Sequence, residues 1–121
     1  MALYVQLPVY KSGYDLLIDI HKVTKIFVRE YKYTLGEKLK KESLQLLIQI
    51  YLANKSKKEL RIQNIDIARQ HVEIIRLLFR VTKDLEIISS KVYVRISIKI
   101  EELSKQLTAW QKYTARAIIK S

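Results

Sequence analysis

Apolar residues recur along most of this chain three or four positions apart, which is the spacing of one face of an α-helix. The first such run predicts a helix over about residues 10–31. Its apolar face consists of Leu16, Ile20, Val23, Phe27 and Tyr31. A second run predicts a helix that ends near residue 54. Its apolar face consists of Leu35, Leu39, Leu46, Ile50 and Ala53.

Two local signals refine these two helices. Thr34 and Glu37 have the Thr-x-x-Glu pattern of a capping box, in which each side chain accepts the backbone amide hydrogen of the other residue. The second helix is therefore predicted to begin at Thr34. Gly13 lies inside the first helix, where glycine costs about 1 kcal/mol relative to alanine, so we expect it to allow a close backbone contact. Residues 1–7 are predicted to form a loose arm before Pro8.

A third run predicts a long helix over about residues 59–88 with two apolar stripes side by side. One stripe is Ile65, Ala68, Val72, Ile75, Phe79 and Thr82, and the other is Ile67, His71, Ile74, Leu78, Val81, Leu85 and Ile88. This apolar face is wider than a seam between two helices requires. After it, Ser89 and Ser90 offer a break and a helix N-cap.

The segment that follows has two possible interpretations. Over residues 92–100, Val and Ile alternate with polar residues, which is the period of a β-strand. The same region belongs to an unbroken helical stripe of Val92, Ile96, Ile100, Leu103, Leu107, Trp110, Thr114 and Ala117. No other segment offers a strand partner, and a lone strand leaves its backbone groups without hydrogen bonds. We therefore predict a fourth helix over about residues 90–118.

Four long helices with short loops predict an all-α fold, an up-down-up-down four-helix bundle. The 121 residues contain two glycines, one proline and no linker-like segment, so residues 1–121 are expected to form one domain. Cysteine is absent, which excludes disulfides and cysteine-based metal sites or nucleophiles and fits a cytoplasmic protein. Residues 1–10 lack the pattern of a signal peptide. The longest apolar stretch, residues 44–53, is too short to cross a membrane.

The net charge of the chain is the compositional feature that says most about its partners. Lys and Arg number 23 against 12 Asp and Glu, and the resulting charge of +11 attracts nucleic acid, anionic membrane or an acidic partner. Several cations stand four positions apart or at the start of the fourth helix, where they repel one another or oppose the helix dipole. Such local costs make sense if an anion meets this surface, although a solvated basic face is equally compatible. The candidate nucleic-acid-binding residues are Arg69, Arg76, Arg80, Lys83, Lys91, Arg95, Lys99, Lys38 and Lys41.

Enzyme signatures are missing from the sequence: it has no phosphate loop, dinucleotide-binding glycines or nucleophile elbow. Asp15 and Asp19 lie four positions apart near His21 and would be the residues of a small metal-dependent enzyme. A solvated acidic face and a partly buried or boundary histidine, for His21 and for His71, explain these residues more simply. We expect no catalytic activity, no cofactor and no metal.

Three segments of the chain carry a family resemblance. They are LPVYKSGYDLLIDIHKVTKIF, REYKYTLGEKLKKESLQLLIQIYLAN and IRLLFRVTKDLEIIS, of which YKYTLGEKL at residues 31–39 is the most specific. Through them the chain resembles the accessory variability determinant, Avd, of diversity-generating retroelements. It is also similar to a broader group of four-helix bundle proteins that includes those encoded in ribosomal RNA intervening sequences. The sequence Leu107-Thr108-Ala109-Trp110 departs from the family pattern, in which glycines precede the tryptophan.

The resemblance implies a homopentamer of four-helix protomers with a basic surface and no catalytic activity of its own. It implies a reverse transcriptase as partner, together with its template RNA and cDNA, and no membrane. The alternative is a helical-bundle scaffold that binds another protein and no nucleic acid.

Overall fold

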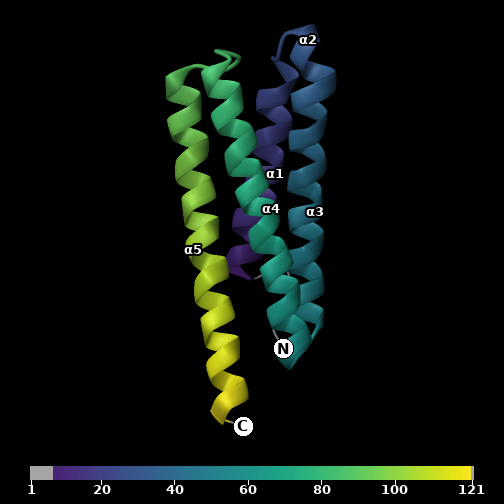
Figure 1. The fold of residues 1–121 in the computed structure, drawn as a ribbon, viewed down its shortest axis with the longest axis vertical. Coiled ribbons are helices and arrows are strands. Elements are labelled where there is room, and N and C mark those ends of the chain that lie inside the picture. The colour runs from purple at the N-terminus through teal and green to yellow at the C-terminus, as the bar shows by residue number, and fades with distance from the viewer. Residues whose placement is uncertain (1–6, 121) are drawn as a thin grey trace.

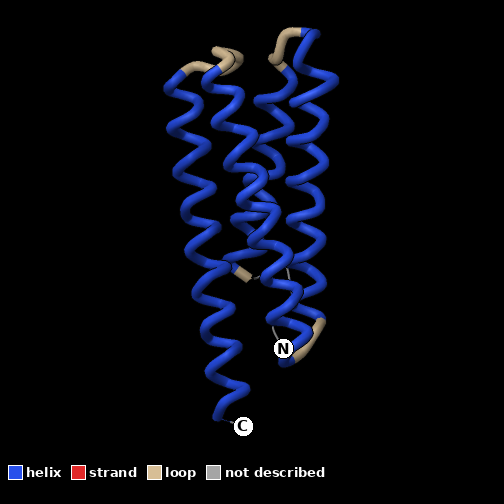
Figure 2. Tube along the Cα trace, viewed as in Figure 1, coloured by secondary structure: helices blue, strands red, loops and turns tan. Residues whose placement is uncertain are grey.

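The computed structural model describes residues 7–120, and within that range the regular elements are all helical (Figures 1 and 2). The four long helices are α1 (Pro8–Lys25), α3 (Glu37–Lys55), α4 (Lys58–Asp84) and α5 (Ser90–Lys120). The short helix α2 (Arg29–Tyr31) and the π-helical turn η2 (Lys32–Gly36) lead into α3. The predicted all-α fold is confirmed, and residues 92–100 are helical. The predicted N-terminal arm lies, except for Leu7, outside the described residues.

The four long helices lie side by side as a bundle. Helices α3 and α5 each pack against both α1 and α4. The loop between α3 and α4 lies at one end of the bundle, and the loops after α1 and α4 lie at the other end (Figure 2). Helix α5 reaches beyond α1 at the end where the α3–α4 loop lies (Figure 1). No helix in residues 7–120 is long and apolar enough to cross a membrane.

The predicted apolar stripes supply the core of the bundle. The largest fully buried side chains are Leu16, Ile20, Leu39, Leu46, Ile50, Ile65, Ile75, Phe79, Ile96, Ile100, Leu103 and Leu107. The first stripe of α4 is buried throughout, from Ile65 to Thr82. The second stripe is buried only in part, because Ile67, Ile74 and Leu85 are exposed. Burial of apolar surface is the main favourable term in folding, so the inner stripes determine how the helices pack.

The first predicted helix is too long, because α1 ends at Lys25 rather than near residue 31. The chain turns over Ile26–Val28 and becomes helical again at Arg29. Phe27 is nevertheless buried as predicted, since the turn places its ring in the core. The turn thus lets one apolar residue stay in the core while the chain reverses into the next helix.

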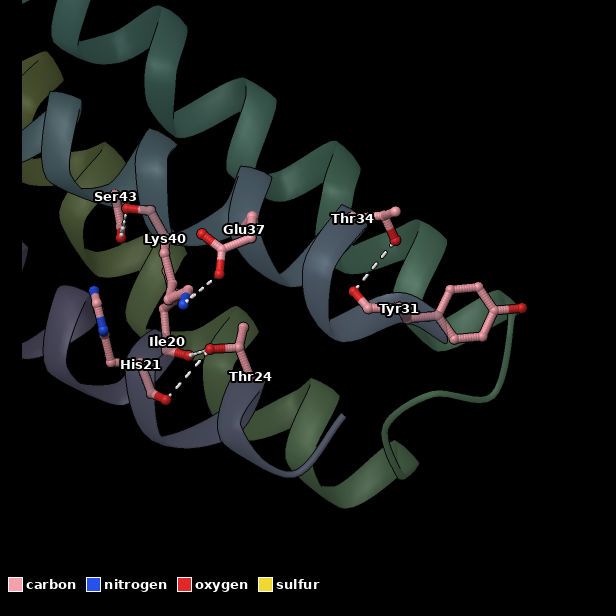
Figure 3. Close-up of polar contacts among 8 residues, drawn as sticks. All are labelled: Ile20, His21, Thr24, Tyr31, Thr34, Glu37, Lys40 and Ser43. Atoms are coloured by element: carbon pink, nitrogen blue, oxygen red, sulfur yellow. Dashed lines mark hydrogen bonds and ion pairs between the residues drawn. The ribbon is translucent and has the colours of Figure 1, made fainter. Parts of the chain in front are cut away.

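The predicted capping box is wrong. The helical backbone already begins at Arg29, so Thr34 lies inside η2, where it is not a cap. Its hydroxyl donates to the backbone oxygen of Glu30 at 3.1 Å. It also donates to that of Tyr31 at 3.3 Å (Figure 3). Glu37 pairs with Lys40, 2.8 Å from its ammonium nitrogen, instead of reaching back to Thr34. A helix that starts earlier leaves no free amide at Thr34 for the capping pattern to satisfy.

The later boundaries agree more closely with the prediction. Helix α4 ends at Asp84, and a turn follows in which Glu86 has a positive φ of 61°. Ile88 folds back into the core from this turn. The predicted break and cap at Ser89 is confirmed, because the Ser89 hydroxyl oxygen accepts the amide hydrogen of Val92 at 3.1 Å.

The loop between α3 and α4 is held by one arginine. The Nε of Arg61 donates to the backbone oxygens of Ala53 and Ser56, and its Nη2 donates to that of Asn54, at 3.0–3.1 Å. These oxygens belong to the end of α3, where backbone acceptors lack helical partners. The guanidinium also lies 5.8 Å from the ring centre of Trp110, so it joins this loop to α5.

Gly13 marks a close approach of α1 to α3. A Cβ atom on Gly13 would lie 2.9 Å from the Cδ1 of Ile50 and 3.4 Å from the Cδ1 of Leu47. Ile50 is fully buried, so it has little room to move. The expected close backbone contact is therefore confirmed.

We predict that Gly13→Leu lowers the free energy of unfolding by about 2 kcal/mol, because overpacking a dense core forces side chains and backbone apart. Gly13→Ala is the matched control. It should stay within about 1 kcal/mol of the parent, because its gain in helix propensity offsets the displacement of one methyl group. Urea unfolding at one fixed protein concentration measures both values. Parental stability of the Leu variant would contradict the close packing of α1 on α3.

Candidate nucleic-acid interface

Two of the predicted basic residues of α4 are paired with acids. A guanidinium nitrogen of Arg76 lies 3.1 Å from a carboxylate oxygen of Glu73, and another meets Glu101 of α5. The Nε of Arg80 lies 3.2 Å from Asp84. The predicted mutual repulsion of Arg76 and Arg80 is therefore largely offset. The binding role of these two residues stays a prediction, but it loses the argument that they oppose local stability.

Two further predicted residues lie at the seam between α4 and α5. The guanidinium of Arg69 donates to the side-chain oxygen of Gln111, whose own amide donates to the backbone oxygen of Ile62 at 3.3 Å. The ammonium of Lys83 lies 5.0 Å from the ring centre of Tyr93, within the range of a cation–π contact. Both cations therefore contribute to helix packing.

The cations at the start of α5 have an acidic partner that local spacing does not reveal. The Oδ2 of Asp19, on α1, lies 2.6 Å from a guanidinium nitrogen of Arg95 and 2.5 Å from the ammonium of Lys99. The Asp19 side chain is only 12% exposed, so the expectation that it lies on a solvated acidic face is wrong. Its carboxylate instead joins α1 to α5.

The titration of Asp19 reflects this position. Burial by itself raises the pKa of a carboxyl group, because it penalises the charged form. The hydrogen bonds and positive charges of Arg95 and Lys99 outweigh burial and lower the pKa of Asp19 below its ordinary value of 3.8. The carboxylate is thus held in its charged form in the folded protein.

The remaining predicted residues are more open. The ammonium of Lys38 lies 3.6 Å from Glu42, whose side chain is almost fully buried. Lys41 and Lys91 are exposed, and neither forms an ion pair with any residue between 7 and 120. Unlike Arg69 and Lys83, which also lack an acidic partner but contact neutral side chains of α5, these two lysines have no side-chain contact among those found in residues 7–120. The nine predicted residues are distributed over three helices, α3, α4 and α5.

A basic groove that the sequence analysis did not predict lies where α1, η2 and α3 meet. Its volume is about 290 Å³. The residues that line it are Ile18, His21, Lys22, Thr24, Lys25, Lys32 and Lys40. Figure 3 shows His21 and Thr24 of α1 opposite Lys40 of α3. The sequence gives no direct signal for this groove, because its cations come from separate helices.

The residues considered for an enzyme are Asp15, Asp19 and His21. Asp19 is engaged by two cations, and Asp15 and His21 are exposed. Among residues 7–120, no group of three or more His, Cys, Asp or Glu side chains could hold a metal ion. His71 is half-buried, as predicted for a boundary histidine, and its Nδ1 lies 2.9 Å from Glu42.

Comparisons with known proteins agree with this fold. The bAvd-like family matches residues 8–114 of the chain. A crystal structure of a protein of unknown function from the S23 ribosomal protein family of Bacteroides thetaiotaomicron superposes with a TM-score of 0.79. It is 18% identical, and the match covers 86% of this chain and 95% of that chain, so it supports the fold alone. Among curated proteins none matches this chain.

We predict that Asp19→Asn lowers the free energy of unfolding by about 1 kcal/mol at neutral pH, because charged hydrogen bonds between α1 and α5 are lost. The lowered pKa sets the sign of the pH dependence. The stabilisation is complete above the ordinary pKa of 3.8 and is lost as the pH falls through the lower folded value.

The difference between parent and variant should therefore shrink below about pH 4. Urea unfolding at a series of pH values measures this difference. Asp15→Asn removes an exposed carboxylate one turn away and should change stability by less than about 0.5 kcal/mol. A difference between parent and Asp19→Asn that does not change with pH would refute the ion-pair assignment.

Proposed function

Because the chain belongs to the bAvd-like family, we propose that it is a non-catalytic accessory protein of a diversity-generating retroelement. In this role it binds the retroelement reverse transcriptase together with template RNA and cDNA, and so supports mutagenic reverse transcription. The observation that carries the proposal is the match to this family over residues 8–114, on a chain with a charge of +11. The order of the helices, up-down-up-down, is part of the proposal and is supported by loops at alternating ends of the bundle (Figure 2).

The distribution of charge supports a nucleic-acid partner. Lys41 and Lys91 are exposed cations that the ion pairs of the bundle do not use, and the groove between α1 and α3 adds more. Ammonium groups of this kind bind phosphates without reading the base sequence, because they act as point charges. Affinity should then depend strongly on salt, since each phosphate contact releases condensed counterions.

The proposed oligomer is a homopentamer, and exposed apolar residues support an interface between copies. On α5, Val94 and Ile98 are 55% and 63% exposed and line a hollow of about 490 Å³ together with Tyr93. On α4, Leu77 is 63% exposed. Burial of exposed apolar side chains under another chain is favourable, so such residues indicate an interface.

A second candidate function is a scaffold that binds an acidic protein and no nucleic acid. The same exposed apolar residues on α4 and α5 favour it, because they suit any protein partner. The two functions differ in RNA affinity near physiological salt, where only the accessory role predicts binding.

We predict that the protein binds a labelled structured RNA near physiological salt and that log Kd changes steeply with log salt. Replacing Lys41 and Lys91 with Glu should weaken binding by about tenfold or more, because two attractive charges become repulsive. Fluorescence anisotropy at several salt concentrations measures both effects.

The matched control replaces the exposed Lys57 and Lys120 with Glu, which changes the net charge equally. Lys57 belongs to the α3–α4 loop and Lys120 ends α5, and these parts of the chain lie at the end of the bundle away from the start of α5 (Figure 1). It should weaken binding by less than about threefold, because only long-range attraction is lost. If the parent binds no RNA even at low salt, the scaffold function is favoured and the nucleic-acid role is wrong.

We also predict a particle of five chains, each of 14.3 kDa, in native mass spectrometry. Ile98→Glu should reduce it to monomers, because a charge cannot be buried in an apolar interface without a partner. Glu102→Gln, on the rim of the same hollow, is the control and should leave the pentamer intact. A parent that is monomeric at micromolar concentration would contradict the pentamer.

A further inference from the structure

The basic groove between α1 and α3 is formed by three consecutive parts of the fold. His21, Lys22 and Lys25 come from the last two turns of α1, Lys32 comes from η2, and Lys40 comes from the start of α3. The turn at Phe27 brings these parts together, because its buried ring lies next to Gly36. A Cβ atom on Gly36 would lie 3.5 Å from that ring and 3.6 Å from the Cβ of Thr24.

The floor of the groove does not neutralise its cations. Thr24 is buried, and its hydroxyl donates to the backbone oxygens of Ile20, at 2.8 Å, and His21, at 3.3 Å (Figure 3). Its one hydroxyl hydrogen is therefore used within α1. Ile18 adds an apolar wall. No acid lines the groove, so its charge comes from lysine ammonium groups alone.

One acid stands close by, and it is engaged. Glu37 lies 2.8 Å from the ammonium of Lys40 (Figure 3). Lys22, Lys25 and Lys32 form no ion pair with any residue that the structure describes. Three uncompensated positive charges thus share a hollow of about 290 Å³.

This arrangement differs from that of four of the predicted binding residues. Arg76, Arg80, Arg95 and Lys99 each have an acidic partner within the bundle. In the groove, like charges converge without such partners and repel one another, which disfavours the fold.

The helix dipole explains only part of this cluster. Lys22 and Lys25 lie in the last turn of α1, where cations are favourable. That effect does not account for Lys32, which lies inside the helical stretch that begins at Arg29. A bound anion would relieve the repulsion among all three lysines.

We infer that this groove binds phosphate groups, and that its ligand is the sugar-phosphate backbone of the nucleic acid. The inference about nucleic acid rests on the proposed function, whereas the phosphate chemistry rests on the groove itself. The volume is at the small end for ligand sites, which suits one phosphate with part of a sugar. Lysine ammonium groups neutralise a phosphate without selecting a base, so the groove positions the strand and does not read its sequence.

The test compares Lys25→Gln/Lys32→Gln with the control Lys57→Gln/Lys120→Gln in anisotropy titrations of labelled single-stranded RNA. Both variants lose two charges, so the control measures the effect of net charge alone. The groove variant should bind about tenfold more weakly, and the magnitude of its salt slope should fall by about 1.4, which corresponds to two lost contacts with a single strand. The control should bind within about threefold of the parent with a slope changed by less than about 0.5.

If the parent binds RNA and the two variants behave alike, the groove inference is overturned while the proposed function stands. The second measurement is a titration with inorganic phosphate. It is monitored by the amide NMR shifts of residues 21–40 in the parent and both variants. Shifts confined to these residues and lost only in the groove variant support a phosphate site. If the parent shows these shifts but binds no RNA, the groove is a site for free phosphate compounds. The proposed nucleic-acid role then fails separately. Absence of both RNA binding and phosphate shifts overturns the groove.

Discussion

The seating of α1 between α3 and α5 is the packing on which the rest of the structure depends. Against α3, the absence of a side chain at Gly13 lets the helices approach until Ile50 fills the space. Against α5, the Asp19 carboxylate holds Arg95 and Lys99. These two contacts close the bundle, because α3 and α5 each pack against α4 and also against α1.

The sequence predicts the architecture well because the core residues recur with the period of an α-helix. Leu16, Ile65 and Leu103 all belong to stripes predicted from spacing alone, and all are fully buried. This period is a property of nearby positions in the sequence, so it can be recognised without knowledge of the tertiary structure. Period alone left residues 92–100 open between a strand and a helix, and the lack of a strand partner decided for the helix.

Local signals failed where tertiary packing outweighs them. The Thr34 and Glu37 pattern predicts a helix start, but the buried ring of Phe27 lets the chain turn earlier, and the helix begins at Arg29. Inside a helix the Thr34 hydroxyl donates to a backbone oxygen of the preceding turn, which is a common alternative for threonine. A motif of four residues carries no information about where the preceding helix ends.

The ion pairs show the same limit more sharply. Asp19 is separated from Arg95 by 76 positions and from Lys99 by 80, so no local pattern can join them. Arg95 and Lys99 therefore lack an acidic partner only among their neighbours in the sequence. The groove escaped prediction for the related reason that its lysines lie on different elements, which meet only after the chain reverses at Phe27.

The cations of this protein therefore include two groups whose replacement has different consequences. Arg76, Arg95 and Lys99 pair with acids of other helices, so changing them alters folding together with surface charge. Lys25 and Lys32 have no acidic partner among the described residues, so changing them alters surface charge with little effect on the bundle. Binding and folding are separable only in the second group. A cation chosen for binding on sequence spacing alone is liable to belong to the first group, because the acid that pairs with it is distant in the chain.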